Sequence, residues 1–286
     1  TLQRRYQKVI EEAPSALLDE ATRQELCAAA VRLARDVGYV NAGTVEFVVP
    51  SERPGDFAFL EMNTRLQVEH PVTEAVTGLD LVELQLRVAA GESLGLSQAD
   101  ICFSGHAMEA RVYAEDPLRG YLPTGGQILQ WTEPQGVRVD SGVGAGDVVL
   151  SHYDPMLAKV IAHASTRIEV IEDLHAALRE MVVFGVVTNI DDLADLLEDP
   201  RVRTGDMDTG LLADHVPRQI PPTPPALAAA APTLLPAARD TLWAGGDAWR
   251  LGGPAAQRWH VADRDVEIRV DDATSAEAGD GAPGIT

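Results

Sequence analysis

The order of apolar and polar residues first indicates a β-hairpin. Residues 43–49 read GTVEFVV and residues 57–61 read FAFLE, and the segment 50–56 between them contains two prolines and a glycine. Branched and aromatic side chains favour strands, whereas proline and glycine favour a loop. The pattern therefore predicts a hairpin over residues 43–61 that brings Glu46 opposite Glu61.

Four segments carry apolar residues at the period of a helix. They are residues 19–37, 80–90, 166–181 and 191–197. Gly38 and Gly91 follow the first two segments, as is typical of helix C-termini, and Thr166 can cap the third. Residues 96–165 are instead short apolar stretches separated by glycine and proline. These stretches predict a twisted antiparallel sheet or half-barrel, so the expected fold class is α+β.

Beyond residue 216 the composition changes. Residues 217–236 are rich in proline and alanine, which predicts an extended, semi-rigid linker. Residues 241–271 alternate in the manner of strands, and the tail after Asp271 consists mainly of glycine, alanine and acidic residues. A segment of that composition cannot bury enough apolar surface to order itself, so we expect the tail to be disordered.

The most informative pattern lies where the hairpin ends. Every second position carries a polar group, in the order Glu61, Asn63, Arg65, Gln67 and Glu69. In an extended chain these five side chains project to one side, while the apolar residues between them anchor in a core. An ordinary amphipathic edge strand also alternates, but it rarely carries acid, amide, guanidinium, amide and acid in succession. The row therefore predicts a functional site on an extended strand.

Glu46 and Glu61 together predict a metal site. Two unpaired carboxylates on one apolar sheet would repel each other and resist desolvation. A divalent cation removes both problems, and hard oxygen ligands suit Mg²⁺ or Mn²⁺. The alternative is that either glutamate pairs with an arginine or faces solvent.

Composition excludes several classes of protein. The chain has 286 residues, 45% of them apolar, which is enough for a buried core. Its formal charge of −21 argues against a nucleic-acid surface. No apolar run is long enough to span a membrane, and no signal peptide is visible. Cys27 and Cys102 lie in separate predicted elements, so we expect buried thiols in a reducing compartment, the cytoplasm.

Five motifs in order carry a resemblance to a known family. They are QRRYQKVIEEAP at 3–14, AGTVEF at 42–47, EMNTRLQVEHP at 61–71, GHAMEARVYAEDP at 105–117 and YDPMLAK at 153–159. With them the chain resembles the biotin carboxylases, the ATP-grasp enzymes of biotin-dependent carboxylation, over residues 1 to about 215. The forms YLPTGG at 121–126 and DPM at 154–156 are most similar to α subunits of bacterial acyl-CoA carboxylases of the acetyl- or propionyl-CoA type.

The resemblance implies a division of the chain. Residues 1–95 are expected to be the C-terminal part of an ATP-grasp domain, and 96–216 the biotin carboxylase C-terminal subdomain, an antiparallel sheet with helices. Residues 217–240 would be the linker, and 241–286 the incomplete start of a subunit-joining domain with the disordered tail. Family members also have a Rossmann-like domain and a Gly-rich lobe in front, so we expect an N-terminally truncated chain that is inactive by itself.

The resemblance also implies the reaction and the ligands at the nucleotide. ATP phosphorylates bicarbonate, the carboxyphosphate breaks down, and N1 of biotin, carried on a separate domain, is carboxylated. Glu46, Glu61 and Asn63 would hold Mg²⁺ or Mn²⁺. Gln3 would contact ATP. Tyr6 stands where the family usually has a histidine that contacts the ribose, and its phenol can still form a hydrogen bond.

The remaining site residues would act on bicarbonate and biotin. Lys8 would lie near the reacting anions, and Arg65 offers a planar fork for bicarbonate or phosphate oxygens. Gln67 and the Val68 amide would orient bicarbonate, with Glu69 as the general base. By resemblance, Arg111 would stabilise the enolate-like oxygen of the ureido ring.

Partners and alternatives complete the expectation. The family implies a biotin carboxyl carrier domain, a carboxyltransferase β subunit and a homo-oligomer, with no nucleic acid and no membrane. One alternative is a truncated, non-catalytic piece that only docks or dimerises, and another is a different ATP-grasp ligase. His70, His106 and His163 are expected to be structural, whereas Asp154 could lie near biotin or at a subunit interface.

Overall fold

The computed structural model describes residues 1–286 except 6, 151, 219–254, 262–263, 273–274 and 281–286. The chain divides into two compact units, Thr1–Arg218 and Gln219–Thr286. Tyr6 and most of the predicted linker lie outside the described residues.

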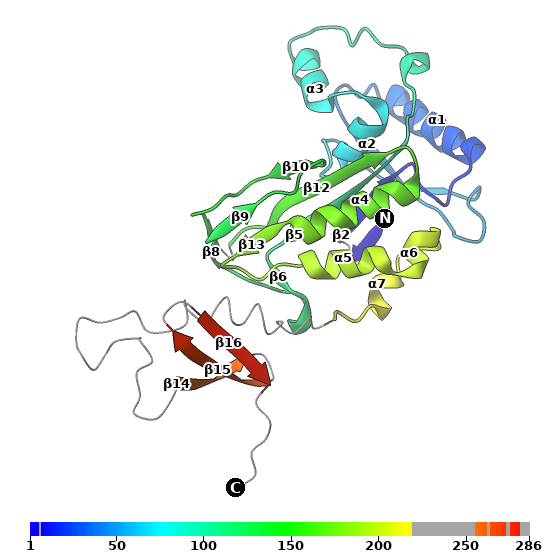
Figure 1. The fold of residues 1–286 in the computed structure, drawn as a ribbon. Helices are drawn as coiled ribbons and strands as arrows, with labels where there is room; N and C mark the ends of the chain where they lie inside the picture. The colour runs from blue at the N-terminus through cyan, green and yellow to red at the C-terminus, as the bar shows by residue number, and fades with distance from the viewer. Residues whose placement is uncertain (6, 151, 219–254, 262–263, 273–274, 281–286) are drawn as a thin grey trace. The chain divides into compact units, whose positions relative to one another are not determined.

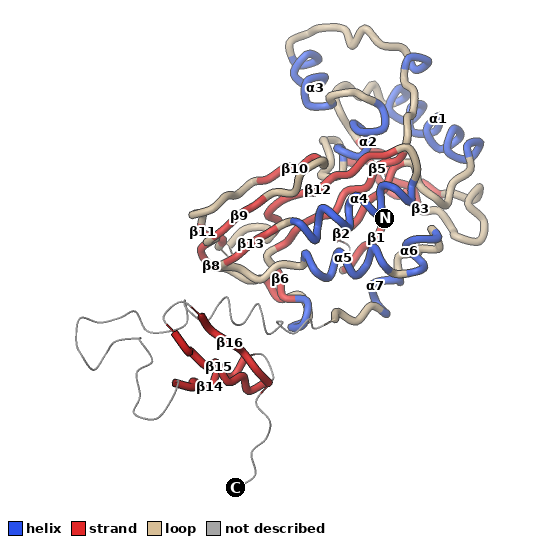
Figure 2. The backbone as a smooth tube through the Cα atoms, in the orientation of Figure 1, coloured by secondary structure: helices blue, strands red, loops and turns tan. Residues whose placement is uncertain are grey.

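A five-stranded antiparallel sheet forms the centre of the first unit, in the order β1-β2-β5-β12-β10 (Figure 1). Its strands are β1 Leu2–Arg4, β2 Gln7–Ala13, β5 His106–Tyr113, β10 Arg138–Ser141 and β12 Met156–Ala164. The two long strands β5 and β12 are adjacent, and helices pack on both sides of them (Figure 2). The α+β class and the antiparallel sheet predicted from the sequence are confirmed.

One face of this sheet is apolar and is covered by α4 Arg167–Glu180 and α5 Ile190–Glu198. The N-cap predicted at Thr166 is present and is half of a capping box, since the Thr166 hydroxyl accepts from the Glu169 amide and the Glu169 carboxylate accepts from the Thr166 amide. Leu174 of α4 packs in one apolar cluster with Ala110 of β5 and Val160 of β12. Burying a side chain the size of Leu174 contributes roughly 1.5–3 kcal/mol, so this face supplies much of the stability.

The opposite face is covered by α2 His70–Thr77, whose Val72 and Val76 pack with Ala107 of β5. Next to this small apolar cluster the sheet carries buried charged side chains. They are Glu11 on β2, Glu109 and Arg111 on β5, and Lys159 on β12. Alternation along each strand therefore separates an apolar face from a charged one.

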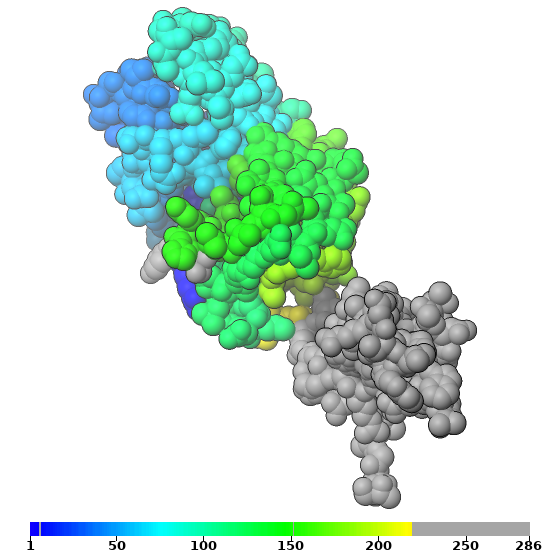
Figure 3. Space-filling model, turned by 90° about the vertical axis from the view of Figure 1, so that its left-hand side faces the viewer, coloured from blue at the N-terminus to red at the C-terminus, as the bar shows by residue number. Residues whose placement is uncertain are grey.

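The predicted hairpin is present as β3 Thr44–Val48 and β4 Ala58–Asn63, and Glu46 is paired with Glu61 as expected. Near it lie α1 Glu20–Asp36 and α3 Leu81–Ala89, whose N-caps Asp19 and Asp80 accept hydrogen bonds from backbone amides. In Figure 3 these segments, drawn in blue to cyan, gather beside the green surface of the sheet.

The prediction of buried thiols is wrong. Cys27 and Cys102 are both free and exposed. Cys27 lies on α1, which has no buried residue, so the apolar spacing that predicted this helix does not by itself establish a buried face.

Short elements complete the first unit. The strand pairs are β6 Glu115–Asp116 with β7 Leu122–Pro123, β8 Gly126–Gln127 with β11 Val148–Val149, and β9 Gln130–Thr132 with β13 Val182–Phe184. The remaining helices are α6 Pro200–Thr204, α7 Leu211–Asp214, and the 3-10 turns η1 Gln98–Asp100 and η2 Pro117–Arg119. None of the helices in the described part of the chain is long and apolar enough to cross a membrane.

Two expectations differ from the structure. The extended strand predicted to run to Glu69 ends at Asn63, and bends and a turn lead into α2, a helix that the sequence pattern did not predict. Pro71 stands in the first turn of α2, where a backbone N–H would have no helical partner, so its absence costs no hydrogen bond.

In the second unit, three strands form an antiparallel sheet. They are β14 Ala255–Val261, β15 Arg264–Asp272 and β16 Ser275–Asp280. The strand β16 corrects the predicted disorder for Ser275–Asp280.

Candidate active site

The polar row of residues 61–69 reaches a common site although it does not stay extended. Glu61 and Asn63 project from the end of β4, whereas Gln67 and Glu69 lie in the turn before α2. Gln67 Nε2 donates to the carboxylate of Glu46 on the neighbouring strand. The turn therefore brings the later residues of the row back toward the hairpin, which the two-residue alternation alone could not indicate.

The amide of Asn63 lies between the two paired carboxylates. Its Nδ2 is 3.2 Å from Glu46 Oε1 and 3.1 Å from Glu61 Oε1. Within the described residues neither glutamate forms an ion pair with an arginine. Glu46 instead pairs with Lys8 at 3.4 Å, and Glu61 is exposed, as the alternative that it faces solvent expects. Rotation of the amide would present its oxygen in place of its nitrogen. Two carboxylates and an amide oxygen are ligands that fit Mg²⁺ or Mn²⁺.

The protein supplies only part of a coordination shell here. The described residues contain no group of three or more His, Cys, Asp or Glu side chains arranged to hold a metal. Mg²⁺ commonly takes one or two carboxylates from the protein and its other ligands from phosphate and water. The donor set of Glu46, Glu61 and Asn63 therefore fits a metal that arrives with a nucleotide.

Lys8 on β2 connects the carboxylate pair to Glu69. Its Nζ donates to Glu69 Oε1 and lies 3.4 Å from both Glu46 Oε1 and Gln67 Oε1. One partly buried ammonium group on the central sheet thus contacts residues from β3 and from the turn before α2. An anion that replaced one of these contacts would find a cation already held in place.

Glu69 is held between two cations. Its Oε1 accepts from Lys8, and its Oε2 accepts from Arg111 at 2.9 Å. Burial raises the pKa of Glu69, but the hydrogen bond from Lys8 and the charges of Lys8 and Arg111 outweigh burial and leave the pKa below its usual value. Glu69 is therefore ionised at neutral pH, which is the state that can accept a proton.

Arg111 is also anchored by Glu11 of the adjacent strand. The nitrogen Nη2 that donates to Glu69 donates to Glu11 as well. Glu109, two residues before Arg111 on β5, is fully buried with its Oε1 3.9 Å from Arg111 Nε. Burial raises the pKa of Glu11 to about 7 and that of Glu109 to about 8. Sequence reasoning missed both acids, although two charged residues on one face of the apolar strand 106–113 were a visible signal.

Lys159 holds the peptide of Val68 in place. Its Nζ donates to the Val68 carbonyl at 2.9 Å and lies 3.3 Å from Asp140 Oδ2. Lys159 is buried, and it pairs in register with Arg111 of β5. The carbonyl side of this peptide is thus tied to the sheet just before Glu69. Sequence reasoning did not identify Lys159 as part of the site.

Other predicted residues lie at the margin of this cluster. Arg65 is exposed and donates to Leu66 O at 3.2 Å and to Asn63 Oδ1 at 3.4 Å. Gln3 stands opposite Lys8 in the β1–β2 pair, and Tyr6 is outside the described residues. Asp154 accepts from the Met156 amide at 2.9 Å, a local turn contact.

Two of the histidines make the structural contacts expected of them. His70 Nδ1 lies 2.7 Å from Gln67 O, and His163 Nε2 lies 2.8 Å from Ser104 O. One nitrogen of each ring therefore contacts a backbone carbonyl, within the turn before α2 for His70 and across two segments for His163.

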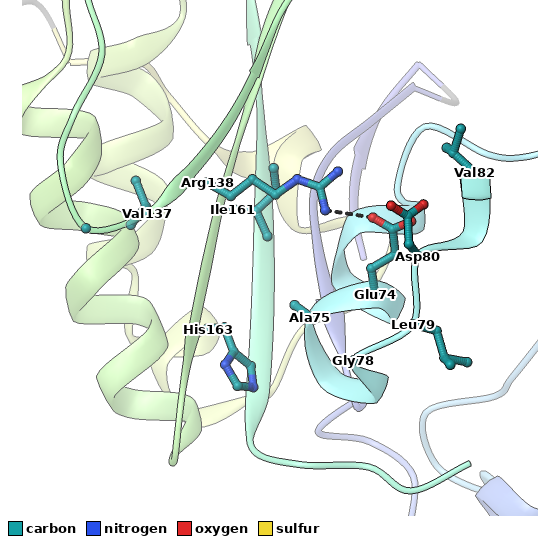
Figure 4. Close-up of a pocket in the computed structure, with 11 residues that line it drawn as sticks. Glu74, Ala75, Gly78, Leu79, Asp80, Val82, Val137, Arg138, Ile161 and His163 are labelled. Atoms are coloured by element: carbon teal, nitrogen blue, oxygen red, sulfur yellow. Dashed lines mark hydrogen bonds and ion pairs between the residues drawn. The ribbon is translucent and has the colours of Figure 1, made fainter. Parts of the chain in front are cut away.

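A large pocket of about 1120 Å³ borders the cluster, and Gln3, Lys8, Glu46, Gln67 and Glu69 are among its lining residues. A second pocket of about 660 Å³ lies between α2 and strands β10 and β12 (Figure 4). It contains none of the predicted site residues. Its Arg138 points across the pocket to Glu74 at 2.7 Å and also binds Asp140. Because the first pocket is lined by predicted site residues and the second is not, the first pocket is the candidate active site.

Comparison with known families gives two matches. The family described as "Carbamoyl-phosphate synthase L chain, ATP binding domain" matches residues 1–97, and the one described as "Biotin carboxylase C-terminal domain" matches residues 109–214. Together they contain all the residues of the cluster around Lys8, Glu46, Glu69 and Arg111.

Similar proteins carry related names. "Biotin carboxylase 2" of Bacillus subtilis is 49% identical over 218 residues, covering 76% of this chain and 48% of that protein. The mitochondrial "Propionyl-CoA carboxylase alpha chain" of Homo sapiens is 50% identical over 221 residues, covering 76% of this chain and 30% of that protein. The chain thus spans about a third to a half of the length of these curated relatives.

A solved structure is similar in fold as well. The biotin carboxylase domain of Hydrogenobacter thermophilus 2-oxoglutarate carboxylase, a dimer in complex with MgADP, ADP and bicarbonate, matches with a TM-score of 0.73. It is 40% identical, and the match covers 75% of this chain and 47% of that one. The likeness therefore extends to the arrangement of the elements that carry the candidate site.

Proposed function

The chain belongs to the biotin carboxylase family, and from this premise we propose that the protein carboxylates carrier-linked biotin with MgATP and bicarbonate. The observation that supports the proposal is a continuous chain of contacts. It runs from the carboxylate pair of Glu46 and Glu61 through Lys8 and Glu69 to Arg111. A phosphoryl-transfer site, a base and a cation for a developing oxyanion are thereby within one network.

The carboxylate pair would hold the metal of MgATP. Glu46 and Glu61 would bind it with their oxygens, and Asn63 would add its amide oxygen. A bound Mg²⁺ would neutralise charge on the phosphates during transfer. Lys8 already contacts Glu46, so it would add a second positive charge beside the transferred phosphoryl group.

Glu69 would act as the base toward bicarbonate. When the bicarbonate O–H bond breaks, its proton passes to the Glu69 carboxylate and the oxygen left behind attacks the γ-phosphorus of ATP. The bond between that phosphorus and the β–γ bridging oxygen breaks, and ADP leaves with the bridging oxygen. Contacts to Lys8 and Arg111 keep Glu69 ionised before this step. Arg65, exposed beside the site, would turn its guanidinium fork toward the bicarbonate oxygens.

Two groups would orient bicarbonate and stabilise the carboxylation step. The carbonyl of Val68 is held by Lys159 at 2.9 Å, which fixes the backbone at this residue, and the amide N–H of Val68 would donate to an oxygen of bicarbonate. Gln67 would add a second contact. Arg111 would stabilise negative charge on the ureido oxygen when N1 of biotin loses its proton, because a fixed cation acts most strongly where charge develops.

We further propose that the product supplies an acyl-CoA carboxylase. The support is the identity of 46–50% to propionyl-CoA carboxylase α chains. The partners would be a biotin carboxyl carrier domain and a carboxyltransferase β subunit, with a second copy of the chain forming a homo-oligomer. The cytoplasm, where ATP is abundant, would be the place of this activity.

The test is a coupled assay on the purified protein as its gene encodes it. It measures bicarbonate- and biotin-dependent release of ADP, together with incorporation of labelled bicarbonate into biotin. Glu69→Gln should lower both by about 10²–10⁴, the usual loss when a general base is removed. Glu52→Gln, a matched change at an exposed loop residue, should leave both unchanged.

Two outcomes would contradict the proposal. Either ADP release would not depend on bicarbonate, or Glu69→Gln would behave like Glu52→Gln. A protein that forms oligomers but never carboxylates biotin would instead favour the docking role.

A further inference from the structure

Unpartnered polar atoms gather beneath Arg111. Among the described residues, five buried side-chain nitrogen or oxygen atoms lack a hydrogen-bond partner, and four of them belong to three neighbouring residues. They are Glu11 Oε2, Glu109 Oε1, Glu109 Oε2 and Arg111 Nε. Buried polar atoms are almost always paired, so a concentration of exceptions at one place requires a physical explanation.

The two acids face each other across adjacent strands. Glu11 of β2 and Glu109 of β5 are direct partners in the antiparallel register. Directly opposed side chains point to the same face, with Cβ atoms about 5 Å apart. Glu11 is 3% exposed and Glu109 is 0% exposed. Two ionised carboxylates at this spacing, away from water, would repel each other and lose their solvation.

The neighbouring cations form no hydrogen bond with Glu109. Arg111 directs its NH2 group to Glu11 Oε1 and to Glu69 Oε2, and its Nε only approaches Glu109 Oε1 to 3.9 Å. Lys159 donates to the Val68 carbonyl and lies beside Asp140. Glu109 therefore has no hydrogen-bonded cation. A neutral Glu109, in contrast, would carry an O–H that can donate to Glu11 Oε2.

The titration of the two acids agrees with this geometry. Burial is the main cause that raises the pKa of Glu109 to about 8, and the charge of Glu11 raises it further. Burial likewise raises the pKa of Glu11 to about 7, against the lowering effect of Arg111. The titratable and charged groups that act on the pair come from β2, β5, β12 and the turn before α2. They are Lys8, Arg111, Tyr113, Lys159 and Glu69.

We propose that Glu11 and Glu109 share one proton across the β2–β5 pair, and that this acid pair is a positioning element that holds the Arg111 guanidinium beside Glu69. With one proton shared, the pair presents a single negative charge to Arg111. The guanidinium is then anchored to the sheet without being drawn away from Glu69 and a reacting anion. The kinetic consequence rests on the proposed carboxylase function, whereas the shared proton does not.

The shared proton can be detected by spectroscopy. In the purified protein with ¹³C-labelled glutamate carboxyls, a neutral carboxyl should be visible near pH 7 by infrared or NMR spectroscopy. The signal should be lost in Glu109→Gln and retained in Glu52→Gln, where the exposed Glu52 is the matched control. If no neutral carboxyl signal is lost in Glu109→Gln, the proton sharing is refuted. This measurement decides the point even for a protein without carboxylase activity.

The positioning role has its own readouts. In Glu11→Gln, the Arg111 Nε–H should exchange with water at least about 10-fold faster, because the charged hydrogen bond that anchors the guanidinium is gone. Carboxylation of biotin should fall at least about 10-fold more than bicarbonate-dependent ATP cleavage, because Arg111 acts where the ureido charge develops.

The pH dependence separates positioning from a merely structural role. In the unchanged protein the ratio of carboxylation to ATP cleavage should fall as the pH rises through about 8, where Glu109 loses its proton, and this fall should be absent in Glu109→Gln. Unaltered Nε–H exchange in Glu11→Gln, or the same pH profile in both proteins, would overturn the positioning role. A protein that cleaves no ATP at all would instead contradict the proposed function and leave the exchange measurement to decide the positioning.

Discussion

Replacing Asn189 by alanine tests how the sheet holds Arg111. Asn189 is 1% exposed and stands at the N-terminus of α5. Its Oδ1 accepts from the Tyr113 amide at 2.8 Å, and its Nδ2 donates to the Arg111 carbonyl at 3.1 Å. One side chain thus pairs the backbone groups of the strand end that carries Arg111, and Asn189→Ala would leave both groups without that partner.

The expected cost follows from the two lost bonds. Leaving a buried donor or acceptor unsatisfied costs about 1–3 kcal/mol each. The Arg111 carbonyl has a second lone pair for other donors, so its loss belongs at the lower end of that range. The backbone bond from the Asn189 amide to Tyr113 O, at 3.2 Å, survives the substitution. We therefore expect Asn189→Ala to lower the free energy of unfolding by about 2–4 kcal/mol.

The assay combines urea unfolding with amide hydrogen exchange at Tyr113. Local opening that becomes easier by about 2 kcal/mol should speed exchange of that amide about 30-fold. Gln130→Ala is the matched control, because it removes an exposed amide that lies 3.3 Å from Thr132 Oγ1, and it should change stability by less than about 0.5 kcal/mol. An Asn189→Ala protein as stable as the control, with unchanged exchange at Tyr113, would refute the reasoning.

Three further predictions concern the site. Glu46→Gln combined with Glu61→Gln should abolish Mg²⁺-dependent nucleotide binding. The fold should stay intact, because the change removes two negative charges that face each other and repel. Calorimetry that finds unchanged MgATP affinity would rule out the metal assignment. Arg111→Ala should reduce biotin carboxylation by about 10²–10³ and ATP cleavage much less, and equal losses in the two assays would assign Arg111 to nucleotide binding instead. The pKa of Glu109 is about 8 in the folded protein against 4.5 as its ordinary value. Between these two pH values the folded state binds more protons than the unfolded state. The free energy of unfolding therefore falls as the pH rises from 4.5 to about 8, by up to ~5 kcal/mol. Urea unfolding at about pH 6 and about pH 9 should show the part of this fall that lies above pH 6, ~3 kcal/mol, in the unchanged protein and little of it in Glu109→Gln. Identical pH dependence in both would argue against a buried titrating acid at this position.

The fold was predictable wherever a local signal is strong. The capping box at Thr166 and the loop between the two strands of the hairpin act on neighbouring residues, so the sequence indicated α4 and the pairing of Glu46 with Glu61. The missed helix α2 shows the limit. The alternation of residues 61–69 fits a strand, yet the chain bends after Asn63 and continues into α2, whose Val72 and Val76 pack on Ala107 of β5, a contact that no local pattern records.

By itself the sequence determined which chemical groups are available. The acids, amides and guanidinium of residues 61–69 were identifiable because residue type and short spacing are local properties, whereas Lys8 and Arg111 were assigned through the family resemblance of their motifs. Only the tertiary structure decided what surrounds them. Glu11, Glu109 and Lys159 meet Arg111 because β2, β5 and β12 are neighbours in the sheet. Burial and charge at that meeting point depend on residues about a hundred positions apart in the chain, and no local pattern records such a contact.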